Sequence, residues 1–175
     1  MPKTTKYSIS IIKGESLKGS ATADKIIALD RRNMEPTLKA VGLEFPEQRR
    51  RATLFHPSNQ IVIAMVEQEV AGYVDYCDDP ADPADLYLSS IQIEPGHRGG
   101  VLFKLLLSHL LASLRSRSFG RIKTNIQKSN GRMMAIARKA GFTLQENPDN
   151  PATLDVFAER RLLDSPKLSR LFDPA

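Results

Sequence analysis

The chain has 175 residues, a length typical of one domain, so we expect a single domain over residues 1–175. Its composition, 41% hydrophobic and 26% charged, is that of a globular protein and excludes disorder, collagen and a coiled coil as overall descriptions. The 25 Lys and Arg residues exceed the 20 Asp and Glu residues and give a net charge of +5, which favours anionic partners in general.

Cysteine usage and the lack of a targeting segment indicate the compartment. Cys77 is the single cysteine and cannot form an internal disulfide, which fits a reduced setting. The start of the chain lacks the apolar run of about seven residues that a secretion signal needs. The most apolar stretch, 101–114, is interrupted by Lys104 and His109 and is shorter than the roughly 20 residues of a membrane span. We therefore expect a cytoplasmic protein without a membrane partner.

The first half of the chain is predicted to form two helices and three strands. Apolar residues at alternating positions predict strands, and apolar residues at helical spacing predict helices. Thr22 is the expected cap of the first helix, and Pro46 lies in the first turn of the second. The expected elements are a strand at 7–12, helices at 23–34 and 46–55, and a hairpin of strands at 60–66 and 70–76.

An acidic segment with two prolines, 78–85, follows the hairpin. Because proline lacks a backbone N–H, we expect this segment to be a loop rather than a helix or a central strand. The spacing of its four aspartates suits a solvated loop better than a metal site. The negative charge of the loop would also attract a cationic amine.

The strand expected at 86–93 breaks the regular alternation of apolar and polar residues. Its apolar residues are Leu86 and Leu88, then Ile91 and Ile93, so they change from even to odd positions across Ser89–Ser90. One extra residue at a β-bulge there would bring both pairs to the same face of the sheet. A strand buried on both faces needs no alternation and is the alternative interpretation.

The second half of the chain alternates helices with strands. Leucines at helical spacing predict a long helix at 101–117, and Asn130, preceded by Ser129, is the expected cap of a helix that stops at Gly141. A strand–helix–strand order requires a crossover and a parallel pair, so the predicted fold class is mixed α+β. The other expected elements are strands at 121–127, 142–145 and 152–157, and a charged tail at 159–175 that forms a surface helix or a loose arm.

The glycine-rich turn at 95–100 is the best candidate for chemistry. The first backbone N–H groups of a helix have no partner within it, and the helix dipole places partial positive charge there. Arg98 and the amides of 99–103 would therefore bind a phosphate or a diphosphate. The turn contains neither G-x-x-x-x-G-K-[ST] nor G-x-G-x-x-G, which argues against P-loop and Rossmann proteins.

Two motifs resemble those of the GNAT acyltransferase superfamily. The run IQIEPGHRGGVLFKLLL at 91–107 is similar to its acyl-CoA motif, a strand ending in Val/Ile-x-Pro, then R-x-x-G-x-G/A, then an apolar helix. The run NGRMMAIARKAGF at 130–142 is similar to its second motif, an Asn-led helix ending in Lys-x-Gly-Phe. The resemblance covers residues 7–157 and implies a mixed, mostly antiparallel sheet with a splayed parallel pair and helices on both faces.

The chain departs from the family pattern at several positions. Val101 and Phe103 stand where the family prefers small residues, which makes the acyl-CoA loop atypical. Ala137 takes the place of the usual proton-donating tyrosine, and Tyr87 lies where a catalytic glutamate often sits. The resemblance therefore implies cofactor binding more strongly than it implies the usual catalytic residues.

The resemblance implies direct transfer of an acetyl or other short acyl group from acyl-CoA, with acetyl-CoA or a related thioester as cofactor, to a primary amine on a small molecule or protein. Asp85 could remove the proton of the amine through water, and Tyr87, Ser89 or Ser90 could donate a hydrogen bond to the sulfur or the oxyanion. The three histidines show no metal-ligand spacing, so no metal is expected. The residues expected to contact CoA are Ile91, Ile93, Arg98, Gly99, Gly100, Val101, Leu102, Phe103, Lys104 and Asn130.

Two other functions stay open on the sequence. Without the usual tyrosine and glutamate, a GNAT-like domain could bind acyl-CoA as a sensor or interaction module without efficient turnover. The basic charge alone would suit a nucleic-acid-binding domain, but the arginines at 49–51 have few aromatic residues nearby for stacking, and a solvated helix face is the preferred interpretation. A homodimer is compatible with the sequence.

Overall fold

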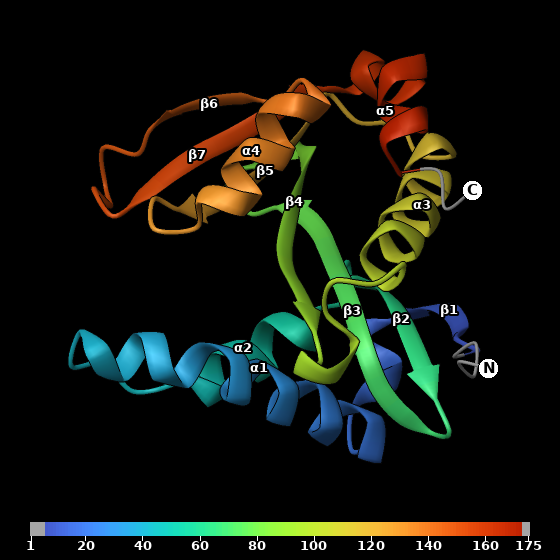
Figure 1. Cartoon of the computed structure of the whole chain (residues 1–175), viewed down its shortest axis with the longest axis vertical. Coiled ribbons are helices and arrows are strands. Elements are labelled where there is room, and N and C mark those ends of the chain that lie inside the picture. The colour runs from blue at the N-terminus through green and yellow to red at the C-terminus, as the bar shows by residue number, and fades with distance from the viewer. Residues whose placement is uncertain (1–5, 173–175) are drawn as a thin grey trace.

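A mixed sheet forms the centre of the molecule in the computed structural model, which describes residues 6–172 (Figure 1). Its strands are β1 (Ser8–Lys13), β2 (Gln60–Val66), β3 (Glu69–Asp79), β4 (Asp82–Ile93), β5 (Arg121–Gln127), β6 (Thr143–Glu146) and β7 (Thr153–Glu159). They follow the spatial order β1-β2-β3-β4-β5-β7-β6, in which β4 and β5 are parallel and all other neighbours are antiparallel. The predicted α+β class is confirmed.

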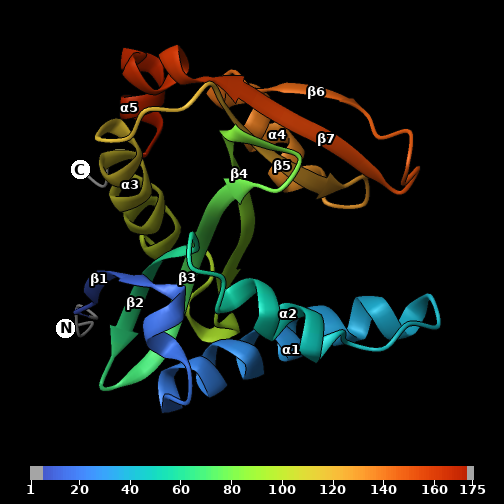
Figure 2. The same ribbon diagram turned by 180° about the vertical axis from the view of Figure 1, so that it is seen from behind.

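Helices cover both faces of this sheet (Figures 1 and 2). On one face lie α1 (Ala21–Ala40) and α2 (Glu47–Leu54), and on the other lie α3 (Leu102–Arg115), α4 (Gly131–Ala140) and α5 (Pro166–Phe172). Three short 3-10 turns are η1 (Gly14–Leu17), η2 (Pro95–His97) and η3 (Arg160–Asp164). Within residues 6–172, no helix has both the length and the apolar content that crossing a membrane requires.

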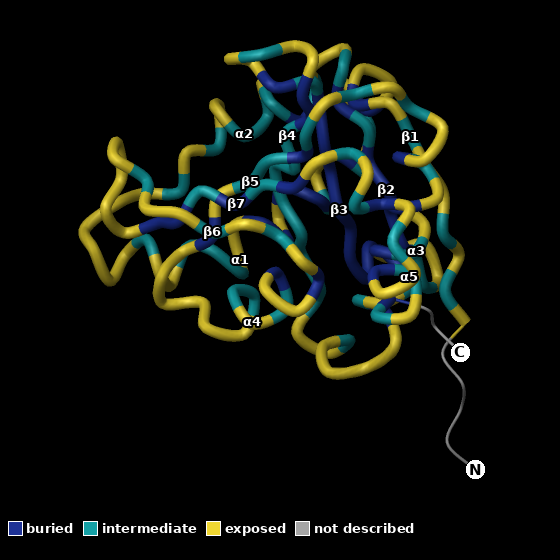
Figure 3. Tube along the Cα trace, turned by 90° about the horizontal axis from the view of Figure 1, so that it is seen from above, coloured by how far each residue is buried: buried dark blue, intermediate teal, exposed yellow. Residues whose placement is uncertain are grey.

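β3 is buried along most of its length, because it lies inside the sheet and is covered on both faces (Figure 3). Its side chains alternate between two cores: Tyr73 packs with α1, whereas Val74 and Tyr76 pack with α3. The turn that precedes it has positive φ at Glu67 (49°) and Gln68 (70°), so the β2–β3 hairpin forms without the favoured glycine.

The β-bulge expected in β4 is present. Ser90 pairs with Asp75 and Leu88 pairs with Tyr76, so Ser89 is an extra residue between two ladder positions. The apolar residues before and after the bulge pack against the same core. The bulge prediction is confirmed.

The prediction of a loop at 78–85 is wrong. β3 continues to Asp79 and β4 begins at Asp82, so the two strands continue almost to the turn between them. Pro83 falls in a part of β4 that has no partner on β3, where its missing N–H removes no ladder bond. The Asp79 carboxylate is buried and binds the Lys123 ammonium at 2.7 Å, which anchors the segment although its prolines and alanines are exposed.

α1 is longer than predicted at both ends. Ser20, rather than Thr22, caps it, because its Oγ accepts the Ala23 N–H at 3.1 Å. The helix also continues past Pro36 to Ala40, in an exposed stretch where the loss of one backbone bond is tolerated. Its outer end and the start of α2 project beyond the sheet (Figures 1 and 2).

α4 begins and ends as the sequence predicts. Asn130 is its cap, and its Oδ1 accepts the Met133 N–H at 3.1 Å. Gly141 terminates the helix with φ +96°, a conformation that side chains other than glycine rarely adopt.

The tail packs on the body of the molecule as a helix, so of its two expected forms, a surface helix or a loose arm, the structure shows the helix. Leu163, Leu168 and Phe172 are buried, and α5 contacts both α3 and α4. Part of the expected tail, residues 173–175, lies outside the described residues. Burial of these apolar side chains is the physical reason for the order of the tail, since they occur among charges at helical spacing.

Candidate active site

β4 and β5 pair over a short distance only, near the middle of β4 and the beginning of β5. Their ladder consists of two residue pairs, starting with Leu86 and Ile122. The Thr124 hydroxyl donates to the Leu88 carbonyl at 2.8 Å just beyond the ladder, and from there the strands diverge (Figure 1). The bulge at Ser89 lies where the divergence begins. The splayed parallel pair is therefore confirmed, and it opens the sheet between two neighbouring strands.

An apolar cavity of about 90 Å³ lies at this opening, on the α3 side of the sheet. Leu88 and Ile91 of β4 and Ile122 of β5 border it, and α3, α4 and α5 enclose it. Ala137 of α4 forms part of its wall. The wall of this cavity is almost entirely apolar, so it suits a hydrocarbon group better than a polar one.

The glycine-rich turn between β4 and α3 is held from two sides. Tyr7 forms a hydrogen bond with the His97 Nδ1 at 3.2 Å. The Arg98 guanidinium donates to the Asn33 Oδ1 of α1 at 2.5 Å and to the Ile93 carbonyl at 3.2 Å. The turn is thus fixed against α1 and the start of the chain, at the mouth of the opening.

The amides at the start of α3 are available to a ligand. Among residues 6–172, none accepts a hydrogen bond from the backbone N–H groups of 99–104, and the first paired amide is that of Leu105, which donates to the Val101 carbonyl at 3.0 Å. Gly99 has φ +78°, which lets the chain turn there without strain. Unpaired amides at a helix start form an anion-binding site.

The side chains of the first turn of α3 point in different directions. Val101 is 44% exposed, whereas Leu102 is fully buried in the core. The Phe103 ring packs edge-on against Phe172 of α5, with 6.4 Å between ring centroids. Lys104 is exposed and adds positive charge beside the free amides. The Phe103 ring therefore packs against α5.

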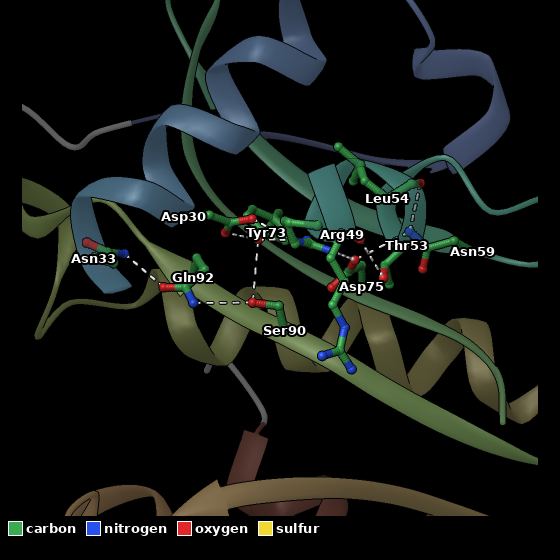
Figure 4. Close-up of polar contacts among 11 residues, drawn as sticks. Asp30, Asn33, Arg49, Thr53, Leu54, Asn59, Tyr73, Asp75, Ser90 and Gln92 are labelled. Carbon is green, nitrogen blue, oxygen red and sulfur yellow. Dashed lines mark hydrogen bonds and ion pairs between the residues drawn. The ribbon is translucent and has the colours of Figure 1, made fainter. Parts of the chain in front are cut away.

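A buried polar cluster lies on the opposite face, between α1, α2 and β3 (Figure 4). The Arg50 guanidinium donates to Asp30 Oδ2 at 2.6 Å, to Asp75 Oδ2 at 2.9 Å and to the Tyr73 hydroxyl at 2.9 Å. The Tyr73 hydroxyl in turn donates to Asp30. Asp30, Tyr73 and Asp75 are completely buried.

This cluster holds two carboxylates and one cation. Burial alone would lower the pKa of Arg50, but Asp75, Tyr73 and Asp30 outweigh it and raise that pKa far above its ordinary value. Burial raises the pKa of Asp75, although Arg50 opposes the shift. Asp75 Oδ1 and Asn59 Oδ1 have no hydrogen-bond partner among the described residues. The cluster is therefore a buried site with an excess of acceptor atoms.

Polar contacts connect the cluster to the bulge in β4 (Figure 4). Ser90 Oγ lies 3.4 Å from the Tyr73 hydroxyl and accepts from Gln92 Nε2 at 3.2 Å. The Gln92 side chain is itself held by Asn33 Nδ2 at 2.9 Å. The opening between β4 and β5 thus has an apolar side under α3 and a polar side under α1 and α2, with Ser90 on the polar side.

Asp85 holds β4 to β5. Its carboxylate accepts the Arg121 backbone N–H at 2.8 Å and forms an ion pair with Lys123 at 2.7 Å. Burial alone would raise the pKa of Asp85, but the hydrogen bonds from Lys123 and Arg121 outweigh it and lower that pKa. A carboxylate so stabilised is a weak base, so its geometry argues against the expected role of Asp85 in proton removal.

Asp85→Asn is expected to lower the free energy of unfolding by about 1–3 kcal/mol at about pH 7, because it removes charge-assisted hydrogen bonds. The folded-state pKa of Asp85 is depressed, so its contribution is present above the ordinary aspartate pKa of about 3.9. That contribution is lost as the pH falls through the folded-state value. Urea unfolding at several pH values should show the two proteins converging in acid.

The matched control is Asp82→Asn. The Asp82 Oδ1 accepts the Ala84 N–H at 3.1 Å, which an asparagine oxygen can also do. This variant should therefore keep wild-type stability. Equal losses in the two variants would contradict the role given to Asp85.

Tyr87 faces the polar side near the same end of β4. Its hydroxyl donates to Asn125 Oδ1 at 2.7 Å, and Asn125 donates to Asp155 at 2.5 Å. Burial raises the pKa of Tyr87, so its phenol stays neutral. It can act as a hydrogen-bond donor only if the hydroxyl leaves Asn125.

No metal site is visible in the described part of the chain, where His, Cys, Asp and Glu form no group of three or more that could hold an ion. Cys77 is buried, with its Sγ 3.8 Å from the Ser89 hydroxyl. Burial raises the pKa of the Cys77 thiol, which keeps it protonated and unreactive.

The sequence predicts a solvated face for the arginines at 49–51, and for Arg50 this prediction is wrong. The Arg50 side chain is only 11% exposed, whereas the Arg49 side chain is exposed and points away from the cluster (Figure 4). Consecutive helical residues point in different directions, so three arginines in a row cannot share one face. The available signal was Asp75, a carboxylate between Val74 and Tyr76 in a buried strand, because such a residue requires a cationic partner.

Sequence comparison gives one match to a described family. A sequence model of the Acetyltransferase (GNAT) family matches residues 26–142. This range includes the diverging strands, the glycine-rich turn and α4. Among curated proteins, none matches the sequence significantly.

Solved structures share the fold at low sequence identity. An acetyltransferase from Streptococcus agalactiae is 15% identical with a TM-score of 0.67, over 86% of this chain and 98% of that one. The PaiA N-acetyltransferase from Thermoplasma acidophilum, solved in complex with coenzyme A, is 11% identical with a TM-score of 0.62, over 87% and 99%. The ribosomal-protein-S18-alanine N-acetyltransferase from Escherichia coli is 15% identical with a TM-score of 0.61, over 88% and 94%.

Proposed function

The chain belongs to the GNAT family of acetyltransferases, and on that premise we propose that it transfers an acetyl or other short acyl group directly from acyl-CoA to a primary amine. The opening between β4 and β5, beside a helix start with free amides, is the observation that carries the proposal. Such an opening admits a thioester from one face of the sheet and an amine from the other.

The diphosphate of CoA is placed on the turn before α3. Arg98, Lys104 and the amides of 99–104 supply positive charge and hydrogen-bond donors there. The pantetheine would follow β4 past Ile93 and Ile91, whose side of the strand lacks a β5 partner in the described structure. Asn130, which caps α4 through its Oδ1, has its Nδ2 left to donate to this arm.

Arg98→Ala is expected to weaken CoA binding about 5- to 30-fold, which corresponds to about 1–2 kcal/mol for a charged hydrogen bond at an exposed site. Calorimetric titration with CoA would measure the change. The control is Arg132→Ala, which removes an exposed arginine of α4. This variant should bind CoA as tightly as wild type. Weaker binding by this variant would mean that net charge, rather than Arg98 itself, sets the affinity. Equal affinities for wild type and Arg98→Ala would remove Arg98 from the site.

The amine is placed on the polar side of the opening. An alkylammonium group has a pKa near 10.4 and must lose a proton before it can attack. Ser90, at the bulge, contacts Tyr73, and Tyr73 donates to Asp30, so a proton can pass toward a cluster that carries one more carboxylate than cations. The new C–N bond then forms as the C–S bond breaks, and the nitrogen gives up its second proton as the amide forms. The thiolate takes a proton from the neutral Tyr87, whose hydroxyl first leaves Asn125, and the proton released by the nitrogen restores the phenol.

Thiol release from acetyl-CoA over a panel of alkylamines, polyamines and peptides with free N-termini tests the proposal. Release that depends on one class of amine supports it. The alternative, an acyl-CoA-binding module without turnover, is favoured by Ala137 at the place of the usual proton donor. Binding of CoA without release from any amine would select that alternative, and failure to bind CoA would overturn both.

A further inference from the structure

The cavity at the opening between β4 and β5, about 90 Å³ in volume, is larger than an acetyl group requires. We propose that it receives the hydrocarbon chain of a longer acyl group, so that the preferred donor is a butyryl or pentanoyl thioester of CoA. This inference rests on the proposed function and names the donor class for the same site.

The chemistry of the cavity wall suits a hydrocarbon. Of its lining residues, only Lys123 and Thr124 carry polar side-chain atoms that form hydrogen bonds. The Lys123 ammonium is held by Asp79 and Asp85, and the Thr124 hydroxyl donates to the Leu88 carbonyl at 2.8 Å. The two amide groups of pantetheine would therefore find few partners in this cavity, whereas an alkyl chain needs none.

The space exists because small residues of α4 face the sheet. Ala137 and Ala140 line the cavity, and a large side chain at either position would enter it. Leu168 and Phe172 of α5 also line it and are buried, so the tail forms a wall that would limit chain length. Phe172 is held by Phe103 at the start of α3, which connects this wall to the diphosphate turn.

The volume sets the length of the chain. An apolar cavity of about 150 Å³ holds one benzene ring of six carbon atoms, so by proportion the cavity of about 90 Å³ holds about three or four carbon atoms. With these carbon atoms counted beyond the thioester carbonyl, this corresponds to a butyryl or pentanoyl group. Longer chains would have to displace α5.

Calorimetric titration of the full chain with CoA and with acetyl-, butyryl-, pentanoyl- and decanoyl-CoA tests the proposal. Each buried methylene should increase affinity about fourfold, so butyryl-CoA should bind about 15-fold more tightly than acetyl-CoA. Decanoyl-CoA should gain nothing further. If CoA and acetyl-CoA bind and butyryl-CoA binds no more tightly, the inference is overturned while the proposed function stands. If no CoA species binds, the proposed function fails and the inference fails with it.

Two variants test whether the acyl chain binds in this cavity. Ala137→Phe should fill the cavity and bring the butyryl-to-acetyl affinity ratio close to one, with binding of unacylated CoA retained. Ala135→Phe adds the same ring to an exposed position on the same helix and should keep the wild-type ratio. If Ala137→Phe does not fold, Phe172→Ala serves in its place, because it enlarges the cavity and should move the optimum to longer chains. An unchanged chain-length preference in the folded variant would show that the chain binds elsewhere.

Discussion

Replacing Arg50 with methionine is expected to lower the free energy of unfolding by about 3–5 kcal/mol, the cost of leaving buried charges without their partner. Arg50 is the one cation that contacts Asp30 and Asp75 in the described structure, and both carboxylates are completely buried. Methionine keeps the unbranched apolar stem of the side chain and removes the guanidinium group with its charge and hydrogen bonds. Urea unfolding followed by circular dichroism would measure the loss.

The control for this prediction is the neighbouring residue. Arg49→Met removes the same charge from an exposed position and should change stability by less than about 0.5 kcal/mol. The deficit of Arg50→Met should also shrink as the pH falls, because burial already raises the pKa of Asp75 and loss of Arg50 would raise it further. A group with a raised folded-state pKa binds protons more readily in the folded protein, so acid favours the fold. Similar losses in the two variants at neutral pH would contradict the cluster.

Val101→Pro is expected to weaken CoA binding about 10- to 150-fold while the protein folds normally. Val101 has φ −71°, close to the value that proline imposes, and its amide donates no hydrogen bond to any described residue. Proline is also common at the start of helices. The substitution therefore removes one N–H from the proposed diphosphate site, and a hydrogen bond to a charged group contributes about 1.5–3 kcal/mol.

Val101→Ala separates the amide from the side chain. It keeps the N–H and removes most of an exposed side chain, so its affinity for CoA should equal that of wild type. Thermal melts of both variants would show whether α3 still forms, since its Leu105 N–H still has the Val101 carbonyl to bond. Wild-type affinity in Val101→Pro would mean that the amides before α3 do not bind the diphosphate.

Elements governed by local periodicity could be predicted from the sequence. The parity change across Ser89–Ser90 predicts the bulge, because the residues on either side must reach one core. Asn130 and Gly141 bound α4 because capping depends on a few neighbouring residues. The parallel pair follows from the order of elements alone, since a crossover helix separates β4 from β5.

Features that depend on tertiary partners could not be predicted in this way. The segment 78–85 continues two strands because Lys123, far along the chain, pairs with Asp79 and Asp85. Likewise, α5 is ordered by apolar surfaces of α3 and α4 that it covers. Neither partner can be identified from the segment itself.

The candidate site was predictable in part. The turn at 98–104 and the unpaired end of β4 lie together, as the resemblance implies, because both are set by the strand–turn–helix order. The residues on the amine side were harder to choose. Asp85 is titratable and near β4 in sequence, yet its carboxylate is committed to Lys123, while Tyr73 and Asp30 reach Ser90 from other elements.

The central claim is that the opening between β4 and β5 admits a CoA thioester with its diphosphate on the turn before α3. A crystal structure of the full chain grown with CoA tests this most directly. The account predicts density for the diphosphate within hydrogen-bond distance of the amides of 99–104, with the thiol end pointing between Leu88 and Thr124. A well-ordered crystal with CoA bound at another surface, or with the opening closed by Phe103 and α5, would contradict it.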